Sequence, residues 1–362
     1  GNFVCDGLVD ALSRPYAGTW AWIRALAPDA PILRERSQKS GGEAEERLRA
    51  LASAASSLLS PNEAESGAVF DDRGRVESVG ELPITAEISV YRAPTDNDRG
   101  RGPVDYWGVS SENLGPLGTG TGQWGVSHAQ RWEMARLHLL RRTWHGSSCE
   151  RGTRVLIERW APPAAQFGLE ARWTFTPVGG KIGGAPAAAA IRGNCLAVKV
   201  EMTPYGRWPE RIPRAGVRLC IPGTEWTASW VGETDIAYSD LPGANPNGFG
   251  CAELKDLWDV GVKPQEGGHR PGLKVLELRG EERALIIIPR SEMGWSASPW
   301  SERELAQAGH WEDLSESNRT FVWLDAVQDG IGTRSCGPDA RPEFGARMAA
   351  RTMEFILCVT DL

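Results

Sequence analysis

The chain has 362 residues, of which 41% are apolar and 24% charged, and this composition predicts a globular protein with one large domain or two ordinary ones. Its net charge of −7 and its lack of a lysine/arginine block argue against a nucleic-acid partner. No stretch approaches the roughly 20 apolar residues of a membrane helix, and the first residues do not resemble a signal peptide, so no membrane partner is expected.

The chain before residue 68 differs in composition from the rest. Residues 1–33 combine apolar and turn-forming residues and indicate a loop that runs into a short apolar segment. Residues 34–67 are rich in Ala, Glu and Ser, and Leu48 and Leu51 belong to an apolar set at helical spacing, with acidic residues before it and a proline after it. This pattern predicts one amphipathic helix at about 43–59 inside a polar linker.

From residue 68 to residue 362 the sequence consists of short alternating runs separated by Gly, Pro, Asn and Asp. Nine runs have the length and the β-branched or aromatic content of strands: TAEISVY, RVLIERW, EARWTFTP, CLAVKVEMT, AGVRLCIP, LKVLELRG, RALIIIPR, TFVWLDAV and TMEFILCV. No long helices separate them, which predicts a mainly β protein, a large antiparallel β-sandwich. One helix is expected at 301–310, where Ser301 and Glu304 have the spacing of a capping box.

The seven cysteines are scattered and odd in number, and no C-x-x-C motif occurs. This pattern predicts no zinc knuckle and no disulfide framework, and it indicates a reducing cytoplasm. Most of the cysteines are expected to be buried small hydrophobic residues. The 16 tryptophans are expected mainly in the core, although an indole ring also stacks well on sugar faces.

The stretch VYRAPTDNDRG, residues 90–100, is dense in charge and turn-forming residues. Its acidic spacing lacks a third ligand at the distance that a calcium loop requires, and Pro94 favours a rigid turn. We therefore predict a structural loop in which Arg92 and Asp98 pair.

Two further loops carry polar residues. The loop VKPQEGGHRPG at 262–272 either lines a site or forms a loop-stabilising network with four side chains: Gln265, Glu266, His269 and Arg270. The Gly/Pro-rich loop at 329–344 is long, and long loops often carry function. No spacing among the acidic residues singles out a glycosidase pair, and G-x-S-x-G is absent from the sequence. The residues alone therefore indicate a sandwich compatible with sugar binding and no specific chemistry.

Several motifs occur together in one order, and this order resembles the C-terminal domain of bacterial β-galactosidases of glycoside hydrolase family 2. The motifs are YRAPTDNDRG, WVGETDIAYSD, KPQEGGHR, SASPWSERELAQAGHWEDL, LDAVQDGIGTRSCGP and RPEF. The resemblance covers residues 68–362 and implies a supersandwich similar to the galactose mutarotase fold.

Residues 1–33 resemble the end of the family's catalytic (β/α)8 barrel. The resemblance implies a sodium site to which the Phe3 carbonyl and the side chain of Asp6, which replaces an asparagine, contribute. The linker at 34–67 is too short for the immunoglobulin-like domain that family members carry there. Cys336 falls where some members place a tryptophan that stacks on the sugar. Cys336 is therefore expected to line the substrate pocket without offering a ring face, so the affinity for the sugar should be weaker or the pocket differently filled.

In the family, both catalytic glutamates and the magnesium ligands lie on barrel strands, and these would precede residue 1. We therefore expect this chain to be the C-terminal part of a retaining β-galactosidase. It would act on lactose-like β-galactosides only with a barrel supplied elsewhere, either in a longer polypeptide or by a large subunit. The missing initiating Met favours the longer polypeptide. The full enzyme is expected to be a cytoplasmic homo-oligomer. Two alternatives remain: a non-catalytic module for carbohydrate binding or oligomerisation, and an aldose epimerase with a His and a carboxylate in a sandwich cleft.

Overall fold

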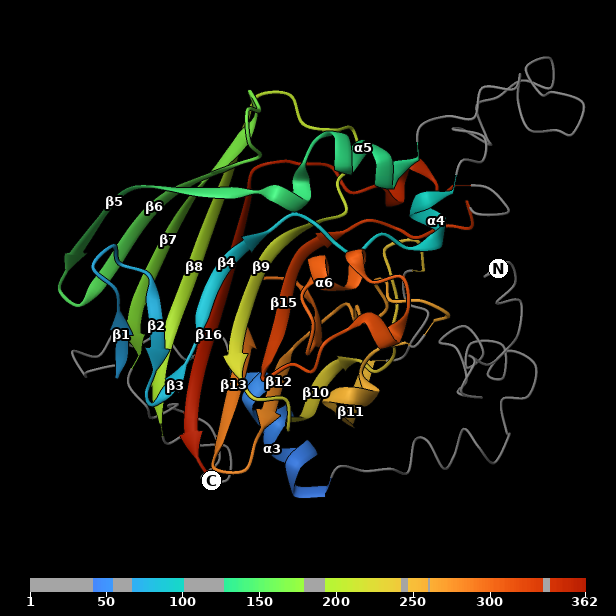
Figure 1. Ribbon diagram of the computed structural model, residues 1–362. Helices are drawn as coiled ribbons and strands as arrows, with labels where there is room; N and C mark the ends of the chain where they lie inside the picture. The colour runs from blue at the N-terminus through green and yellow to red at the C-terminus, as the bar shows by residue number, and fades with distance from the viewer. Residues whose placement is uncertain are drawn as a thin grey trace, which may run out of the picture.

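A computed structural model describes residues 42–54, 67–100, 127–178, 193–241, 247–259, 261–334 and 339–362 (Figure 1). Nine antiparallel strands form the larger sheet of this described part. In spatial order they are β11 (Asn247–Glu253), β10 (Thr227–Glu233), β12 (Val275–Arg279), β13 (Arg283–Pro289), β16 (Arg351–Asp361), β8 (Asn194–Tyr205), β7 (Gly168–Val178), β6 (Thr153–Ala161) and β5 (Arg141–Glu150).

A smaller antiparallel sheet faces the middle of the large one. Its strands, in spatial order, are β14 (Gly294–Ser298), β15 (Arg319–Gln328), β9 (Arg214–Pro222) and β4 (Thr85–Ser89). A third, three-stranded sheet contains β1 (Ala68–Phe70), β2 (Val76–Val79) and β3 (Leu82–Pro83). All nine predicted segments coincide with strands, and every recorded strand pair is antiparallel, which confirms the predicted β-sandwich.

Helices make up a small part of the fold. The described part contains α3 (Gly42–Ala54), α4 (Asp96–Arg99), α5 (His128–Met134) and α6 (Glu302–Gln307), with 3-10 turns η3 (Leu137–Leu139), η5 (Leu254–Asp256), η6 (Trp311–Asp313) and η7 (Pro342–Phe344). At the start of α6 the Ser301 hydroxyl accepts a hydrogen bond from the Glu304 amide, and the Glu304 carboxylate accepts one from the Ser301 amide, which confirms the predicted capping box. None of the described helices has the length and apolar character needed to cross a membrane.

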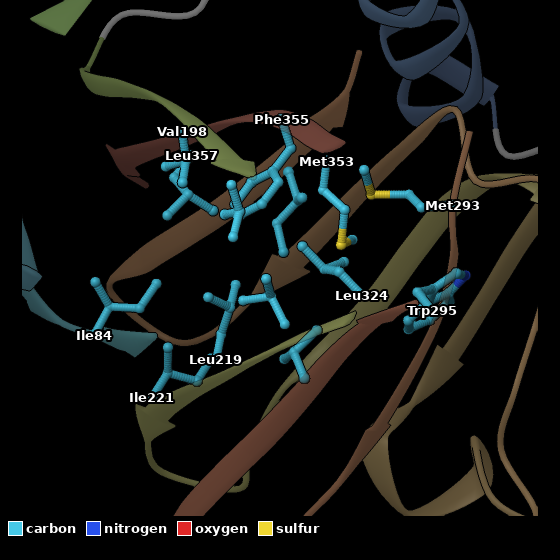
Figure 2. Packing of buried hydrophobic residues seen from close by; sticks show 14 of the residues in the cluster. Ile84, Val198, Leu219, Ile221, Met293, Trp295, Leu324, Met353, Phe355 and Leu357 are labelled. Carbon is cyan, nitrogen blue, oxygen red and sulfur yellow. The ribbon is translucent and has the colours of Figure 1, made fainter. Parts of the chain in front are cut away.

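The main hydrophobic core lies between the two sheets (Figure 2). Leu219, Ile221 and Leu324 from the smaller sheet lie opposite Val198 and Leu357 from the larger one, and all five are at most 3% exposed. Burying an aliphatic side chain of this size contributes about 1.5–3 kcal/mol. This apolar interior holds the two sheets together and fixes the loops at their ends.

Part of the outer face of the large sheet is also apolar, and α3 packs on it beside β10 and β12. Along β13, Leu285 and Ile287 point into the main core, while Ile286 and Ile288 belong to a second cluster with Leu48 and Leu51 of α3. Successive residues of a strand point to opposite faces, so a strand covered on both faces appears as an unbroken apolar run. The predicted helix therefore exists, and its start agrees with the prediction; residues 55–59 lie outside the described part.

The prediction of no disulfide was wrong for one pair of cysteines, which is buried, and two other cysteines are exposed rather than buried. Cys195 on β8 and Cys358 on β16 form a disulfide, although they are 163 residues apart in the sequence. They are directly opposite each other in the strand register, with their Cα atoms 4.2 Å apart, and no spacing rule reveals such a pairing. Cys149 and Cys251 are exposed because they lie on β5 and β11, the two outermost strands of the large sheet.

Candidate functional site

Loops that are far apart in the sequence meet beside α4 (Figure 1). The Asn97 side-chain amide donates to the Gly332 carbonyl at 2.6 Å, and the Asp96 amide donates to the Gln265 side-chain oxygen at 2.9 Å. Asp240 accepts hydrogen bonds from the amides of residues 331 and 332 at 3.1 and 2.7 Å. Four of the motifs identified in the sequence thus form one polar network, which we call the motif network.

Local sequence explains the conformation of residues 92–98. Thr95 caps α4: its hydroxyl accepts from the Asp98 amide at 3.1 Å, and Asp98 Oδ2 accepts from the Thr95 amide at 2.8 Å. Asp98 is 1% exposed, so its carboxylate is committed to the interior. Within the described residues no group of three His, Cys, Asp or Glu is arranged to hold a metal ion.

Arg92 is the centre of the motif network. Its fully buried guanidinium donates to both oxygens of Asp98, at 3.1 and 2.7 Å, and to the backbone carbonyl of Asp329 at 2.6 Å. The rings of Trp132 and Tyr238 lie 5.4 and 5.9 Å from its Cζ atom. Burial alone would lower the pKa of Arg92, but the charge of Asp98 raises it above the ordinary value. The predicted pair of Arg92 and Asp98 is therefore present, and Arg92 is a permanent cation.

A second group of charges extends the network. Arg211 binds the carboxylate of Asp329 at 3.0–3.1 Å, and it lies 3.1 Å from Asp339. His128 Nε2 lies 2.7 Å from the same Asp339 oxygen. Burial would raise the pKa of Asp339, but the hydrogen bond with His128 and the charges of His128 and Arg211 lower it to about 2. This carboxylate is ionised throughout the neutral range, so it is unsuited to act as a general acid.

The loop at 262–272 forms a network rather than an open site. His269 Nδ1 lies 3.1 Å from Asp325 Oδ2, and Arg214 contacts the same carboxylate at 3.1 Å. Tyr238 donates to Glu266 at 3.2 Å. His269 is 5% exposed and Asp325 is 2% exposed, so this histidine–carboxylate pair is buried and does not lie on the wall of a cleft, where an epimerase would need it.

Arg270 has a different role from the other residues of that loop. Its guanidinium packs against both Trp230 and Trp295, with its Cζ atom 5.1 and 5.5 Å from the two ring centres. It donates to the carbonyls of Leu257 and Gly268 at 2.9 and 3.0 Å. Burial lowers the pKa of Arg270 to about 10. Of the two hypotheses for this loop, the loop-stabilising network is the one that its contacts support.

The three site residues inferred from the resemblance, Phe3, Asp6 and Cys336, lie outside the described residues. The described neighbours of Cys336 on either side, Arg334 and Asp339, belong to the motif network, with 3.7 Å between their charged groups.

The sequence reasoning did not identify Arg211, Asp329 or His128 as part of this site. One usable signal was Ser127, whose capping box with Gln130 places α5 and therefore His128.

Comparison with known proteins gives consistent matches. The β-galactosidase small chain family matches residues 64–357. The β-galactosidase of Arthrobacter sp. (strain B7) is 29% identical over 305 residues, which cover 80% of this chain and 28% of that protein. The β-galactosidase of Kluyveromyces lactis is 21% identical over 281 residues, covering 75% of this chain and 23% of that protein. The chain thus spans less than a third of the length of these curated relatives.

Two solved structures are distantly similar. A putative aldose 1-epimerase from Escherichia coli K12 is 14% identical with a TM-score of 0.36, and the match covers 80% of this chain and 93% of that chain. A galactose mutarotase related enzyme from Lactobacillus acidophilus is 9% identical with a TM-score of 0.35, and the match covers 81% of this chain and 94% of that chain.

Proposed function

Because the chain belongs to the β-galactosidase small chain family, we propose that it is the C-terminal part of a β-galactosidase and that it acts only together with a catalytic barrel supplied elsewhere. The observation that carries this proposal is the family match over residues 64–357. The substrate would be a terminal non-reducing β-galactoside such as lactose, and the partner would be the rest of a longer polypeptide or a large subunit.

The charges of the described site support an accessory role. Retaining hydrolysis requires two carboxyl groups about 5–5.5 Å apart, one of which is protonated when the glycosidic bond breaks. In the motif network, Asp98 is bound to Arg92, Asp329 to Arg211, and Asp339 to His128 and Arg211. These carboxylates are all committed to cations, so they hold loops in place. We propose that the barrel contributes the acid/base and the nucleophile.

We propose that the end of the sandwich that carries the motif network faces the barrel. Arg92 and Asn97 fix the backbone of residues 329–332 through hydrogen bonds to its carbonyls, and this backbone leads to Cys336. In this proposal Cys336 lines the substrate pocket, and the Phe3 carbonyl and Asp6 contribute to a sodium site. Magnesium would bind to the barrel. The full enzyme would be a homo-oligomer in the cytoplasm.

Complementation tests the proposal. The 362-residue chain is mixed with the Arthrobacter β-galactosidase truncated to remove the segment that matches this chain, and hydrolysis of a chromogenic β-galactoside is measured. We expect no turnover by either polypeptide alone and turnover by the mixture. Turnover by the 362-residue chain alone that disappears on substitution of one of its own Glu or Asp residues would contradict the proposal. Gel filtration of the mixture measures association independently of activity.

A further inference from the structure

A groove that takes no part in the motif network lies between β4 and β5, which are outermost strands of their respective sheets. It consists of two hollows that share Arg142. The inner hollow, of about 310 Å³, lies between β4, η3, β6 and the start of α6. The outer hollow, of about 510 Å³, lies beside Trp144 and the turn between β1 and β2. Pockets for small ligands in proteins have volumes of this order. We call the two hollows together the β4–β5 groove.

Aromatic rings in fixed orientations line this groove. Trp144 is 44% exposed, and its indole nitrogen donates to the Arg73 carbonyl at 3.0 Å, which holds the ring in place. Arg142 is directly opposite Trp160 in the strand register, and its Cζ atom lies 5.6 Å from the centre of that ring. An indole that is held by its own hydrogen bond and still exposed offers a flat apolar face to a ligand.

The charged side chains of the groove largely neutralise one another, with one arginine in excess. Arg218 contacts both Glu87 and Glu302, the latter at 2.8 Å. The lining contains three acidic residues and four arginines: Asp72, Glu87, Glu302, Arg73, Arg142, Arg218 and Arg303. Burial lowers the pKa of His138, so the imidazole adds little charge at neutral pH. A cationic ligand would find no net counter-charge here, and a strongly anionic ligand would find an excess of only one arginine.

Paired charges still form hydrogen bonds. A carboxylate has about four acceptor positions and a guanidinium has five donors, so an ion pair leaves capacity on both partners. The groove thus presents hydrogen-bond donors and acceptors beside an apolar ring face. A neutral ligand with many hydroxyl groups would match this surface. This description fits a saccharide better than a lipid, a nucleotide or a peptide.

We propose that the β4–β5 groove binds a neutral oligosaccharide, with Trp144 stacking on one sugar ring at the open end and Arg142 and Glu87 bonding to hydroxyl groups further in. This site does not depend on a catalytic barrel or on the proposed hydrolysis. It would hold carbohydrate without cleaving it.

The test uses the full 362-residue chain, which is titrated with lactose, cellobiose and maltotriose by isothermal calorimetry and by ligand-observed NMR. We expect at least one of these saccharides to bind, and we expect Trp144→Ala to weaken that binding about tenfold, while Trp144→Phe retains most of it. Tyr205→Ala is the matched control, because Tyr205 is a similarly exposed aromatic residue, 40% exposed, outside the groove, and it should leave the affinity unchanged.

Each other outcome overturns the proposal. It is wrong if the folded wild-type chain, checked by circular dichroism, binds none of the three saccharides. It is also wrong if Trp144→Ala binds as tightly as the wild type, or if Tyr205→Ala weakens binding equally. Hydrolysis is not measured, so a failed complementation experiment leaves this test unaffected, and a failed titration leaves the complementation result unaffected.

Discussion

Removing the carboxylate of Asp98 should destabilise the protein strongly, because it leaves the Arg92 guanidinium charged inside the sandwich. Arg92 is 0% exposed and Asp98 is 1% exposed, so water does not replace the lost partner. Breaking a buried ion pair by removing one member costs about 3–5 kcal/mol. Asp98→Ala also removes the acceptor for the Thr95 amide, a cap whose loss alone costs about 1 kcal/mol.

This free energy can be converted into a melting temperature. The entropy of unfolding is about 2.1 cal/mol/K per residue, or about 0.54 kcal/mol/K for the roughly 260 residues that the structure describes, so a loss of 3–5 kcal/mol should lower the Tm by about 6–9 °C. Thermal unfolding followed by circular dichroism measures this shift, and urea unfolding measures the free energy. Asp98→Asn, which keeps an acceptor oxygen, should have an intermediate effect.

Glu170→Ala is the matched control. It removes the partner of Arg159 from a pair in which both side chains are more than 40% exposed, and such pairs contribute less than about 1 kcal/mol. In a double-mutant cycle with Arg92→Met, Asp98→Ala should show a coupling free energy of about 1–3 kcal/mol. If Asp98→Ala and Glu170→Ala reduced stability equally, the argument that burial makes the Arg92–Asp98 pair important would be refuted.

Three further predictions follow from the charges, the packing and the disulfide. The folded-state pKa of Asp339 is about 2 and its unfolded-state pKa is about 3.9, so its contribution to stability is complete above about pH 4 and disappears as the pH falls towards 2. Urea unfolding from pH 6 to pH 2.5 should therefore show about 2 kcal/mol of pH dependence that Asp339→Asn lacks. Equal pH profiles for the two proteins would contradict this. Leu51→Ala, at a fully buried position of α3, should lower the free energy of unfolding by about 2–5 kcal/mol in urea titrations, and a change below 0.5 kcal/mol would show that α3 does not pack on the sheet. Alkylation followed by mass spectrometry should show that Cys149 and Cys251 react in the native protein, whereas Cys195 and Cys358 react only after reduction and unfolding. If Cys195 and Cys358 were labelled in the unreduced, unfolded chain, the disulfide would be excluded.

The sequence was most informative where a strand has at least one apolar face. Runs such as RALIIIP predict a strand that is covered on both faces, and each of the nine predicted segments lies on a strand. The missed strands lack this signal. β5, with the sequence RRTWHGSSCE, is exposed at nearly every position because it is the last strand of its sheet. β14, GWSAS, is fully buried but short and rich in serine, so its composition resembles that of a turn.

The same limit applies to the site. The pair of Arg92 and Asp98 was predictable because its members are six residues apart and a turn brings them together. The partners Arg211 and Asp329 are 118 residues apart, and Arg92 binds a backbone carbonyl at residue 329, which no side-chain pattern encodes. Contacts of this kind depend on how the loops at one end of the sandwich fold over each other. Phe3, Asp6 and Cys336 remain predictions.

The helix α3 affects how this protein can be shortened for experiments. Arg47 of α3 forms a salt bridge with Glu277 of β12, which is only 3% exposed. The other cationic neighbour of Glu277 is Arg279, at 3.6 Å. A recombinant fragment that begins at residue 64, where the family match begins, would lack this helix. Its loss would expose the isoleucines on the outward face of β13 and remove a counter-ion of Glu277. The resulting exposed apolar patch would favour aggregation. Fragments that begin before residue 42 keep that surface covered, and should remain in solution where the shorter fragment precipitates.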